Sequence, residues 1–409
     1  MRGMNQTLSI GERIAWYRRR RGLSQEVLAG LVGRTADWLS KIENNRIDLD
    51  RLSTIKALAD ALDVQLADLL AEPSLLEWTR ETHGPTVIVL RDVLMDYRNM
   101  SALLPASPTG AVDPDLLRLR QEVSTAWTAY QDGSYAHATK LIPALVGHAQ
   151  EAVGFFEGDD LLRAKSLLAL TYQSAAMVLT KLGEVDLAWL AADRGLAAAQ
   201  ESGEPVVIGS LFRSVSHCLL ANGRFQAARQ LTHDAADYLE HGLETSSPTH
   251  LSVYGTLFLV GAMAAAQDGD RSSANDFLLR ADVAAQCLGR DANHLWTAFG
   301  PTNVAIHRVA TALELGDAQL ASTLGPRVDT TGLPTERRVR HAMELARAES
   351  ALNRTDEALT LLLDAEQLAP EQVRYHRIPR QLVMGWIRHQ RGRPSTALDS
   401  FARRLHLVH

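Results

Sequence analysis

Apolar residues near the start of the chain recur at helical spacing, between residues that typically begin or end helices. Ser24 can cap a helix that begins at Gln25, because its hydroxyl accepts hydrogen bonds from the first free amides. Gly33 can end that helix in the left-handed conformation, and Thr35 can cap the next one. The residues expected to face a core from these two helices are Leu28, Leu31, Val32, Leu39 and Ile42. The pattern predicts two short helices separated by a tight turn.

Three further helices complete the predicted N-terminal unit, at residues 10–21, 52–62 and 64–70. Two short helices joined by a turn that contains glycine form the geometry that lays the second helix in a DNA major groove. An ordinary helical hairpin in a protein core is the alternative. Over residues 9–72 the sequence resembles the Xre/Cro-C1 family of phage and bacterial repressors. The resemblance implies a helix-turn-helix domain that binds double-stranded DNA.

The same resemblance indicates which residues contact DNA. It places Thr35, Ala36 and Lys41 toward base edges, and Gln25 at the backbone or an adjacent base. Asp37 either accepts a hydrogen bond from a cytosine amino group or balances the charge at the start of its helix. The complete set expected at DNA is Gln25, Arg34, Thr35, Ala36, Asp37, Trp38, Lys41, Asn44, Arg46, Arg18 and Arg19.

The distribution of charge supports this assignment. The whole chain has a net charge of −6, which argues against a basic coat that binds nucleic acid everywhere. Residues 1–47, however, contain nine Arg and Lys against four Asp and Glu. The densest run, residues 18–21, ends the first helix beside the surface that contacts phosphate in this fold.

Composition and motifs argue against several other classes of protein. No stretch reaches the roughly 18 consecutive apolar residues of a membrane span, and no signal-peptide core follows Met1. Cys218 and Cys287 lie in apolar helical sequence and are expected to be buried thiols, not a disulfide or a metal pair. No phosphate-binding loop or zinc-protease motif occurs. We therefore expect no enzyme activity, no catalytic or metal-binding residues, no cofactor and no membrane partner.

The rest of the chain carries an internal repeat, in which a glycine is followed five residues later by an alanine. The copies are Gly133/Ala138, Gly183/Ala188, Gly223/Ala228, Gly269/Ala274, Gly316/Ala321 and Gly392/Ala397, with Asn353/Ala358 as a seventh. The residues seven positions before these turns are Ala126, Ala176, Ser216, Ala262, Val309, Ala346 and Gly385. Small residues at registered positions indicate two antiparallel helices that pack closely around a tight turn.

These helical pairs resemble tetratricopeptide repeats, and Trp127, Tyr130 and Tyr135 give the best match in the first copy. Successive turns are 37 to 50 residues apart, which indicates degenerate copies with extended helices or loops. The predicted fold is all-α. It comprises a five-helix helix-turn-helix domain at residues 1–72, a helical linker at 73–114, and a right-handed tetratricopeptide-like α-solenoid for sensing and dimerisation at 115–409. An unrelated helical bundle is the alternative to the solenoid.

Helical phase indicates where the solenoid could bind a ligand. If the turn residue marks one fixed repeat position, residues 13, 10, 6, 3 and 2 before it project into the concave surface. The polar residues found there are Gln173, Lys181, Arg213, His217, Asn303, Arg340 and Arg347, and the apolar ones include Met177, Met263 and Met343. Arginine binds carboxylates through two hydrogen bonds, and asparagine can bond an extended peptide backbone. As a set these residues predict a ligand-binding groove.

Together the two parts resemble the Rap/Rgg/NprR/PlcR/PrgX group of peptide-controlled, quorum-sensing regulators and their actinobacterial relatives. The resemblance implies a cytoplasmic homodimer that binds an inverted-repeat operator and a signalling peptide or small-molecule effector. Two alternatives stay open. The repeat domain could dock a protein partner instead of a diffusible ligand, or it could serve only for dimerisation.

Overall fold

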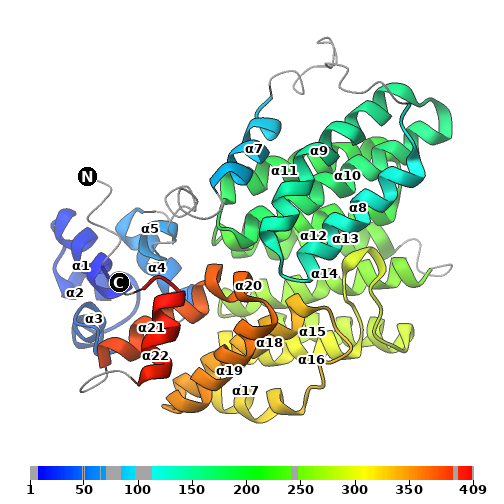
Figure 1. Cartoon of the computed structure of the whole chain (residues 1–409). Helices are drawn as coiled ribbons and strands as arrows, with labels where there is room; N and C mark the ends of the chain where they lie inside the picture. Colours follow the sequence, from blue (N-terminus) through cyan, green and yellow to red (C-terminus); the bar gives the residue numbers. More distant parts are fainter. Residues whose placement is uncertain are drawn as a thin grey trace.

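The chain folds into α-helices and loops in the part that the computed structural model describes, which comprises residues 8–47, 49, 51–64, 66–70, 84–96, 113–240, 247–389 and 395–407. Figure 1 shows a small N-terminal unit packed beside a much larger array of helical pairs. The predicted all-α fold class is confirmed. Three expected features lie outside the described residues: the domain boundary at residue 72, the parts of the linker at residues 73–83 and 97–112, and the turn residue Gly392.

Five short helices form the N-terminal unit. They are α1 (Ile10–Arg20), α2 (Gln25–Leu31), α3 (Ala36–Glu43), α4 (Leu52–Leu62) and α5 (Leu66–Leu70). Ser24 and Thr35 cap α2 and α3 as predicted, because their hydroxyls accept hydrogen bonds from the amides of Val27 and Trp38. Gly33, between the two helices, has a φ of 65°. The sequence-based prediction of this unit is therefore confirmed helix by helix.

A small apolar core holds the five helices together. Its fully buried members include Ile14, Leu28, Leu39, Ile55 and Leu58. Gly11 lies where α1 crosses α3, because a Cβ placed there would be 2.0 Å from the carbonyl oxygen of Ile42. Leu31, which the apolar pattern grouped with the core, is 62 % exposed because α2 ends there and no described helix covers it.

Helical pairs make up most of the remaining chain. They are α8 (Leu116–Gln131) with α9 (Tyr135–Phe155), α10 (Gly158–Lys181) with α11 (Val185–Ser202), α12 (Pro205–Ala221) with α13 (Phe225–Glu240), α14 (Pro248–Gln267) with α15 (Arg271–Leu288), α16 (Pro301–Glu314) with α17 (Ala318–Leu324), and α18 (Thr335–Ala351) with α19 (Thr355–Leu368). After α20 (Pro370–Tyr375) come α21 (Arg377–His389) and α22 (Thr396–Arg404). We call helices α8 to α22 the repeat array.

The described pairs turn at the residues that the repeat predicts. The φ angles of these turn residues are 75° at Gly133, 77° at Gly183, 68° at Gly223, 82° at Gly269, 91° at Gly316 and 62° at Asn353. This left-handed region suits glycine, which has no Cβ, and asparagine tolerates it better than most residues. The alanine five residues after each of these six turns is fully buried. The predicted repeat of antiparallel helical pairs is thus confirmed in six copies.

A separate helix, α7 (Gly84–Leu94), lies within the segment expected to link the two parts. Its side chains Val87, Leu90 and Leu94 are buried in the main apolar core of the repeat array. The helix packs against α9 and α11. This part of the predicted linker is therefore fixed to the first repeats.

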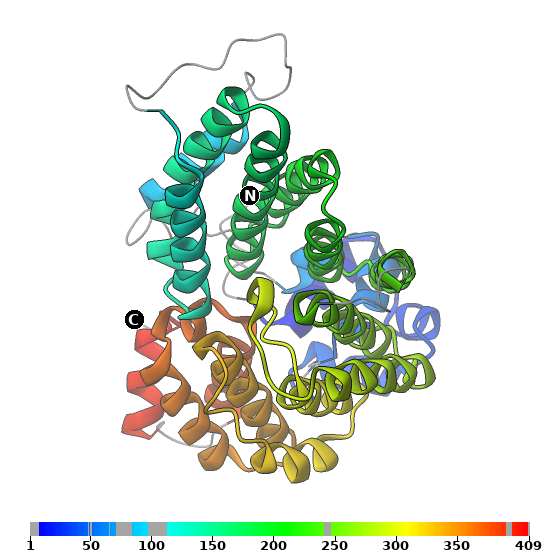
Figure 2. The same ribbon diagram turned by 90° about the vertical axis from the view of Figure 1, so that its right-hand side faces the viewer.

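The repeat array curves so strongly that its last helices meet its first. In Figure 2 the helices after α17 (orange) lie next to α8 (cyan), and Ala136 N on α9 donates to Glu371 Oε2 on α20 at 2.8 Å. The indole of Trp127 on α8 stacks on that of Trp296, with ring centroids 5.0 Å apart. Lys181 Nζ at the end of α10 lies 2.5 Å from Glu336 Oε1 on α18. The array therefore closes on itself, and the predicted concave surface lies inside the ring of helices.

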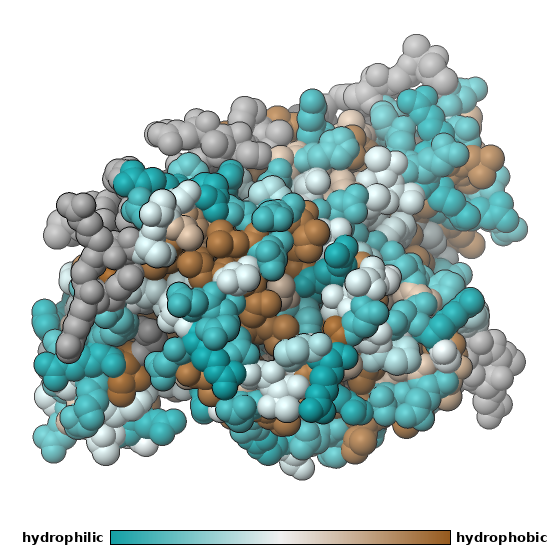
Figure 3. Space-filling model, turned by 60° about the horizontal axis from the view of Figure 1, so that its bottom comes forward, coloured by the Kyte–Doolittle hydropathy of each residue, from teal (hydrophilic) through white to brown (hydrophobic). Residues whose placement is uncertain are grey.

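One helix of the array, α14, is long and apolar enough to cross a membrane, yet 83 % of its most apolar window is buried inside the protein. It packs against α12, α13, α15 and α16 and is a core helix of the array. On the face seen in Figure 3, hydrophilic residues cover most of the surface and hydrophobic residues gather in a strip near its centre. Cys218 is buried as expected, but Cys287 is exposed on α15, and no disulfide joins them.

The N-terminal unit packs against the turn ends of the helical pairs, along an interface that we call the seam. Phe225, the first residue of α13, is buried in the apolar core of the N-terminal unit. A Cβ on Gly223, in the preceding turn, would lie 2.9 Å from the side chain of Leu66. His389 Nε2, at the end of α21, is 2.6 Å from the carbonyl oxygen of Asn45. Residues far apart in the sequence thus share one interface.

Substituting alanine for two helical glycines of the N-terminal unit should change its stability in opposite directions. We expect Gly11→Ala to lower the free energy of unfolding by about 1–3 kcal/mol, because the new Cβ meets the carbonyl oxygen of Ile42. Gly30→Ala, in α2, has no atom within 4 Å of its new Cβ and should raise it by about 0.5–1 kcal/mol. Urea unfolding of both variants tests whether α1 crosses α3 at Gly11. Equal changes in the free energy of unfolding would contradict this packing.

Candidate functional site

The surface around α3 is accessible to solvent within the described part of the chain. The residues predicted at DNA that are exposed are Arg19, Arg34, Thr35, Asp37, Asn44 and Arg46, and those that are partly exposed are Gln25, Ala36, Trp38 and Lys41. We call these ten residues the reading surface. Its accessibility with the N-terminal unit docked at the seam means that docking leaves α3 able to meet a partner.

Arg18 differs from the other predicted DNA contacts, because it is buried and paired within the protein. Its Nε and Nη2 atoms donate to the two carboxylate oxygens of Glu43 at 2.5 and 2.7 Å, and its Nη1 donates to the Leu23 carbonyl oxygen at 2.8 Å. Gln25 Nε2 donates to the same carboxylate at 2.7 Å. A two-point arginine–carboxylate pair is among the stronger protein hydrogen bonds. Arg18 therefore ties α1 to α3 and is not free to bind phosphate.

Two contacts hold side chains of the reading surface in place. Lys41 Nζ lies 2.6 Å from Asp37 Oδ2, one helical turn away, so Asp37 balances charge in the unbound protein. The guanidinium of Arg34 lies over the ring of Trp38, 5.5 Å from its centroid. Exposed pairs of this kind contribute little to stability, so DNA can exchange them at small cost.

A cavity of about 410 Å³ lies at the seam, and both parts of the chain line it. The N-terminal unit contributes Ser9, Ile10, Gly11, Arg13, Ile42, Asn45, Ile47, Leu49, Leu52 and Leu70. The repeat array contributes residues of α10, α12, α14 and α16, one face of α18, and parts of α20 and α21. Any molecule held there would touch the N-terminal unit and several repeats at once.

The cavity is strongly basic. Its lining includes nine cations, namely Arg13, Lys181, Arg337, Arg340, Arg347, Arg374, Arg377, Arg380 and Arg388, and one carboxylate, Glu344. Its apolar wall includes Met177, Val260, Met263, Ile306 and Trp386. The lining combines a positive wall with an apolar one, which suits a ligand that carries negative charge.

Comparison with known proteins identifies the first part of the chain. Residues 9–72 match the family model described as "Helix-turn-helix domain". The N-terminal unit is a helix-turn-helix domain. No curated protein matches the chain.

Three solved structures of similar helical arrangement are BtubC from P. vanneervenii, a Rap protein complexed with competence and sporulation factor, and aspartyl phosphate phosphatase F from Bacillus subtilis. Their identities to this chain are 15 %, 13 % and 12 %, with TM-scores of 0.35, 0.46 and 0.44. The matches cover 68 %, 89 % and 88 % of this chain and 95 %, 100 % and 94 % of the other chains. At this identity, nothing that these proteins bind or do carries over to the present chain.

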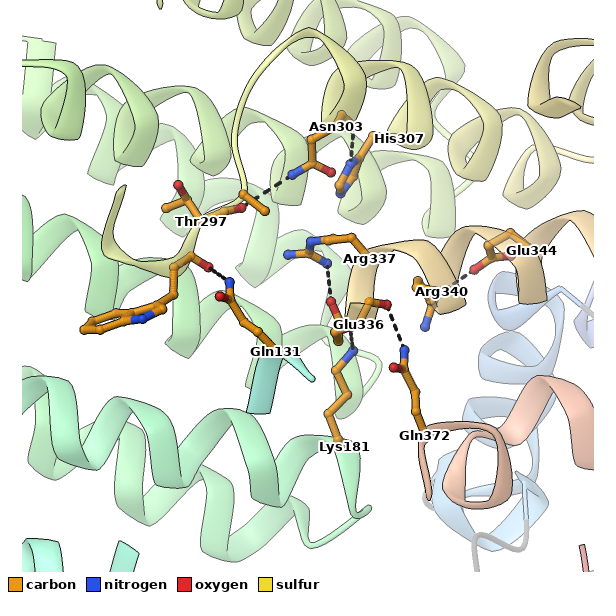
Figure 4. A network of polar contacts seen from close by, with 12 residues as sticks. Gln131, Lys181, Thr297, Asn303, His307, Glu336, Arg337, Arg340, Glu344 and Gln372 are labelled. Atoms are coloured by element: carbon orange, nitrogen blue, oxygen red, sulfur yellow. Dashed lines mark hydrogen bonds and ion pairs between the residues drawn. The ribbon is translucent and has the colours of Figure 1, made fainter. Parts of the chain in front are cut away.

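An ionic network that we call the basic cluster lies in the cavity wall and behind it. It consists of the cations Lys181, Arg213, Arg337, Arg340, Arg347 and Arg377 and the carboxylates Glu314, Glu336 and Glu344. Figure 4 shows Lys181 and Arg337 converging on Glu336, at 2.5 and 3.4 Å. Arg340 lies 2.6 Å from Glu344, one turn along α18, whereas the pair of Lys181 and Glu336 joins α10 to α18.

Charge controls protonation within this cluster. Burial alone would raise the pKa of Glu336, but Lys181, Arg337 and Arg340 hold that pKa at about 2. Burial and then the positive charge of Arg337 lower the pKa of His307 to about 4. Burial and Arg213 lower the pKa of His217 well below its usual value. The histidines that face the cavity are therefore neutral at pH 7, while the carboxylate is ionised.

Four of the seven residues predicted to bind a ligand line the cavity. They are Lys181, His217, Arg340 and Arg347, and the predicted apolar residues Met177 and Met263 join them. Met343 is instead fully buried in a core of the last repeats. The helical phase thus identified the concave end that faces the helix-turn-helix domain.

Gln173 and Asn303 lie away from the cavity and make contacts within the protein. Gln173 Nε2 donates to the backbone oxygen of Ser210 at 2.7 Å and to Ser214 Oγ at 3.0 Å, which joins α10 to α12. Asn303 Nδ2 donates to the Thr297 carbonyl oxygen at 3.5 Å. Thr297 belongs to the loop before α16, which lies against the concave side (Figure 4). The loop before α16 therefore lies over concave positions that are 10 to 13 residues before the turns, such as Asn303.

Arg213 is also absent from the lining, although it lies next to it. Its side chain is fully buried on α12, one helical turn before His217, which does line the cavity. Burial and the neighbouring Arg337 lower the pKa of Arg213 to about 10. Arg213 therefore contributes its charge from behind the cavity wall.

Sequence reasoning missed the charged residues that α18 and α21 add. Arg337 lies one helical turn before Arg340, which is the first concave position that helical phase predicts in its repeat. Arg377, Arg380 and Arg388 belong to the last, irregular repeat. The arginine-rich start of α18, residues 337–340, was the available signal. Its significance depends on ring closure, which brings α18 against α10.

We expect Lys41→Ala to weaken binding to the operator by about 1–3 kcal/mol if Lys41 contacts a base, because such contacts are worth that much. Lys140→Ala, which removes an exposed lysine from α9, is the control and should change affinity less. Titration of a labelled operator with the full chain measures both. An unchanged binding isotherm for Lys41→Ala would contradict the prediction that α3 reads bases through Lys41.

Stability should fall as the pH drops from about 6.5 toward 4. His307 has a folded pKa below its unfolded value, so the unfolded chain binds more protons in this window. Each such histidine then costs up to about 1.4 kcal/mol of stability per pH unit. Urea unfolding at pH 7, 6 and 5 should show this slope, and His307→Gln should flatten it. The exposed His137→Gln is the control, and an equal slope in both variants would contradict the assignment.

Proposed function

We propose that this chain is a sequence-specific transcription regulator whose DNA binding is controlled by a peptide or small molecule in the seam cavity. The observation that carries the proposal is that the helix-turn-helix domain and the repeat array line one basic cavity together. A ligand there contacts both parts, so its binding energy depends on how they are arranged. The ligand residues we assign are Lys181, His217, Arg340 and Arg347, with Arg213 behind them.

The accessibility of the reading surface supports the DNA-binding half of this proposal. Lys41, Arg34 and Arg46 are at least partly exposed while the domain is docked at the seam. Arg19 and its exposed neighbours Arg20 and Arg21 supply positive charge for phosphate at the end of α1. The domain can therefore bind DNA while its other side responds to the cavity.

The finer organisation follows from the sequence expectations. We assign residues 1–72 to DNA reading, residues 73–114 to the connection and residues 115–409 to sensing and dimerisation. A homodimer presents two reading helices, and a palindromic operator with half-sites about one helical turn apart would accept both. Tethering the two domains raises affinity through effective concentration.

Coupling between cavity and DNA requires a ligand that prefers one arrangement of the seam. A preference of about 1.4 kcal/mol changes the equilibrium between two arrangements tenfold. His389 on α21 contacts the carbonyl oxygen of Asn45, which lies between Asn44 and Arg46 of the reading surface, so movement of α21 reaches the residues that follow α3. A single contact, between His389 and Asn45, therefore links α21 to the residues beside the reading surface.

Selection of bound duplexes from a random library by the full chain, followed by footprinting, tests DNA recognition. We expect an inverted repeat with two protected half-sites. His389→Ala at the seam should then change operator affinity by about fivefold or more, as allosteric couplings typically do. The exposed His137→Ala on α9 should leave it unchanged. Binding without sequence preference, or equal affinity for both variants, would contradict the proposed function.

A further inference from the structure

We propose that the ligand of the seam cavity is a compact polyanion, a small molecule with two or more phosphate or carboxylate charges. It would bind between the basic cluster and Arg13 of the helix-turn-helix domain. This inference rests on the proposed function, because it assigns the chemical class of the controlling ligand. Three independent features of the cavity lead to it.

The first feature is an imbalance of charge, in which Arg213 and Arg347 are buried and the other four cations are partly exposed. The basic cluster contains six cations against three carboxylates, and the side chains of Glu314, Glu336 and Glu344 are only 1 %, 3 % and 2 % exposed. Those carboxylates are already shared among Lys181, Arg340 and Arg347. Buried cations are costly unless opposite charge offsets them. A ligand with two or three negative charges would restore the balance.

The second feature is a buried guanidinium with unused donors. The Nε and Nη2 atoms of Arg213 are buried and have no hydrogen-bond partner among the described residues. Arg213 lies beside Arg337, which lines the cavity, and its nearest carboxylate, Glu336, is engaged by Lys181. A buried charged donor without a hydrogen-bond partner costs more free energy than a neutral polar group in the same position. An anion held by Arg337 and His217 would offset the charge of Arg213 through the cavity wall.

The third feature is repulsion across the seam itself. Arg13 on α1 and Arg388 on α21 both line the cavity, one on each side of it. Burial and then the charge of Arg388 lower the pKa of Arg13 to about 10. The guanidinium of Arg13 donates to the uncharged carbonyl oxygens of Leu69 and Leu8. A polyanion between the two arginines replaces repulsion with attraction and holds the helix-turn-helix domain docked.

The size of the cavity favours a compact ligand over an extended peptide. Its 410 Å³ lies near the lower end of the range of about 300–1,000 Å³ that is typical of small-molecule sites. Met177, Met263 and Ile306 form an apolar wall that can cover the uncharged part of such a molecule. The ligand class is therefore a small, charged metabolite-like molecule.

Thermal unfolding and calorimetric titration of the full chain test the inference directly. The probes are sodium pyrophosphate for phosphate chemistry and sodium citrate for carboxylate chemistry, against sodium chloride at equal ionic strength. We expect at least one probe to raise the unfolding temperature beyond the chloride control. The stronger probe identifies the source of the charge. No stabilisation by either probe beyond chloride would overturn the inference.

Variants place the binding at the cluster. Arg337→Gln and Arg213→Met should each weaken the effective probe at least tenfold. Arg213→Met should also leave the unfolding temperature without probe unchanged or higher, because it removes an unpaired buried charge. Arg163→Gln, an exposed position on α10, is the matched control and should keep full probe binding. Full binding by both cluster variants would show that the anion binds elsewhere and would overturn the inference.

The two proposals fail in different ways. If the probes do not bind but the operator is recognised and His389→Ala alters affinity for it, the ligand class is wrong and the regulator assignment stands. If the probes bind through Arg337 and Arg213 but no sequence-specific operator is found, the proposed function is wrong.

Discussion

Unbalanced positive charge, gathered where two parts of the chain meet, is the constraint on which this structure depends. Buried cations persist only where carboxylates, hydrogen bonds or a ligand replace their lost hydration. Glu314, Glu336 and Glu344 offset half of the six cations of the basic cluster. The closed curvature of the repeat array keeps the others together, and the helix-turn-helix domain closes the same cavity with Arg13. The docking of that domain and the charge balance of the cavity therefore depend on each other.

Features that act over one helical turn could be predicted from the sequence. A tight turn between antiparallel helices needs a residue that tolerates positive φ, so Gly133 or Asn353 indicates a turn even in an alanine-rich chain. Ser24 and Thr35 act on amides three residues away, which makes their capping role visible in the sequence. Such signals identified the helix-turn-helix domain and the described hairpin turns.

Features that depend on distant contacts could not be predicted in the same way. Arg18 stands among arginines in the sequence, but its partner Glu43 is 25 residues away, so its internal role emerges only when α1 meets α3. Lys181 and Glu336 are separated by 155 residues and meet because the array closes on itself. Helical phase predicted Gln173 on the concave surface, but it could not indicate that α12 would take its hydrogen bonds.

Hydrogen exchange of the full chain, free and saturated with its operator, tests the central claim that the reading surface and the cavity are coupled. Binding free energies couple reciprocally, so DNA must affect the cavity if the cavity affects DNA. The account predicts altered protection in α18 and α21 as well as in α3, although neither α18 nor α21 belongs to the DNA-reading domain. Protection changes confined to residues 9–70 would contradict it.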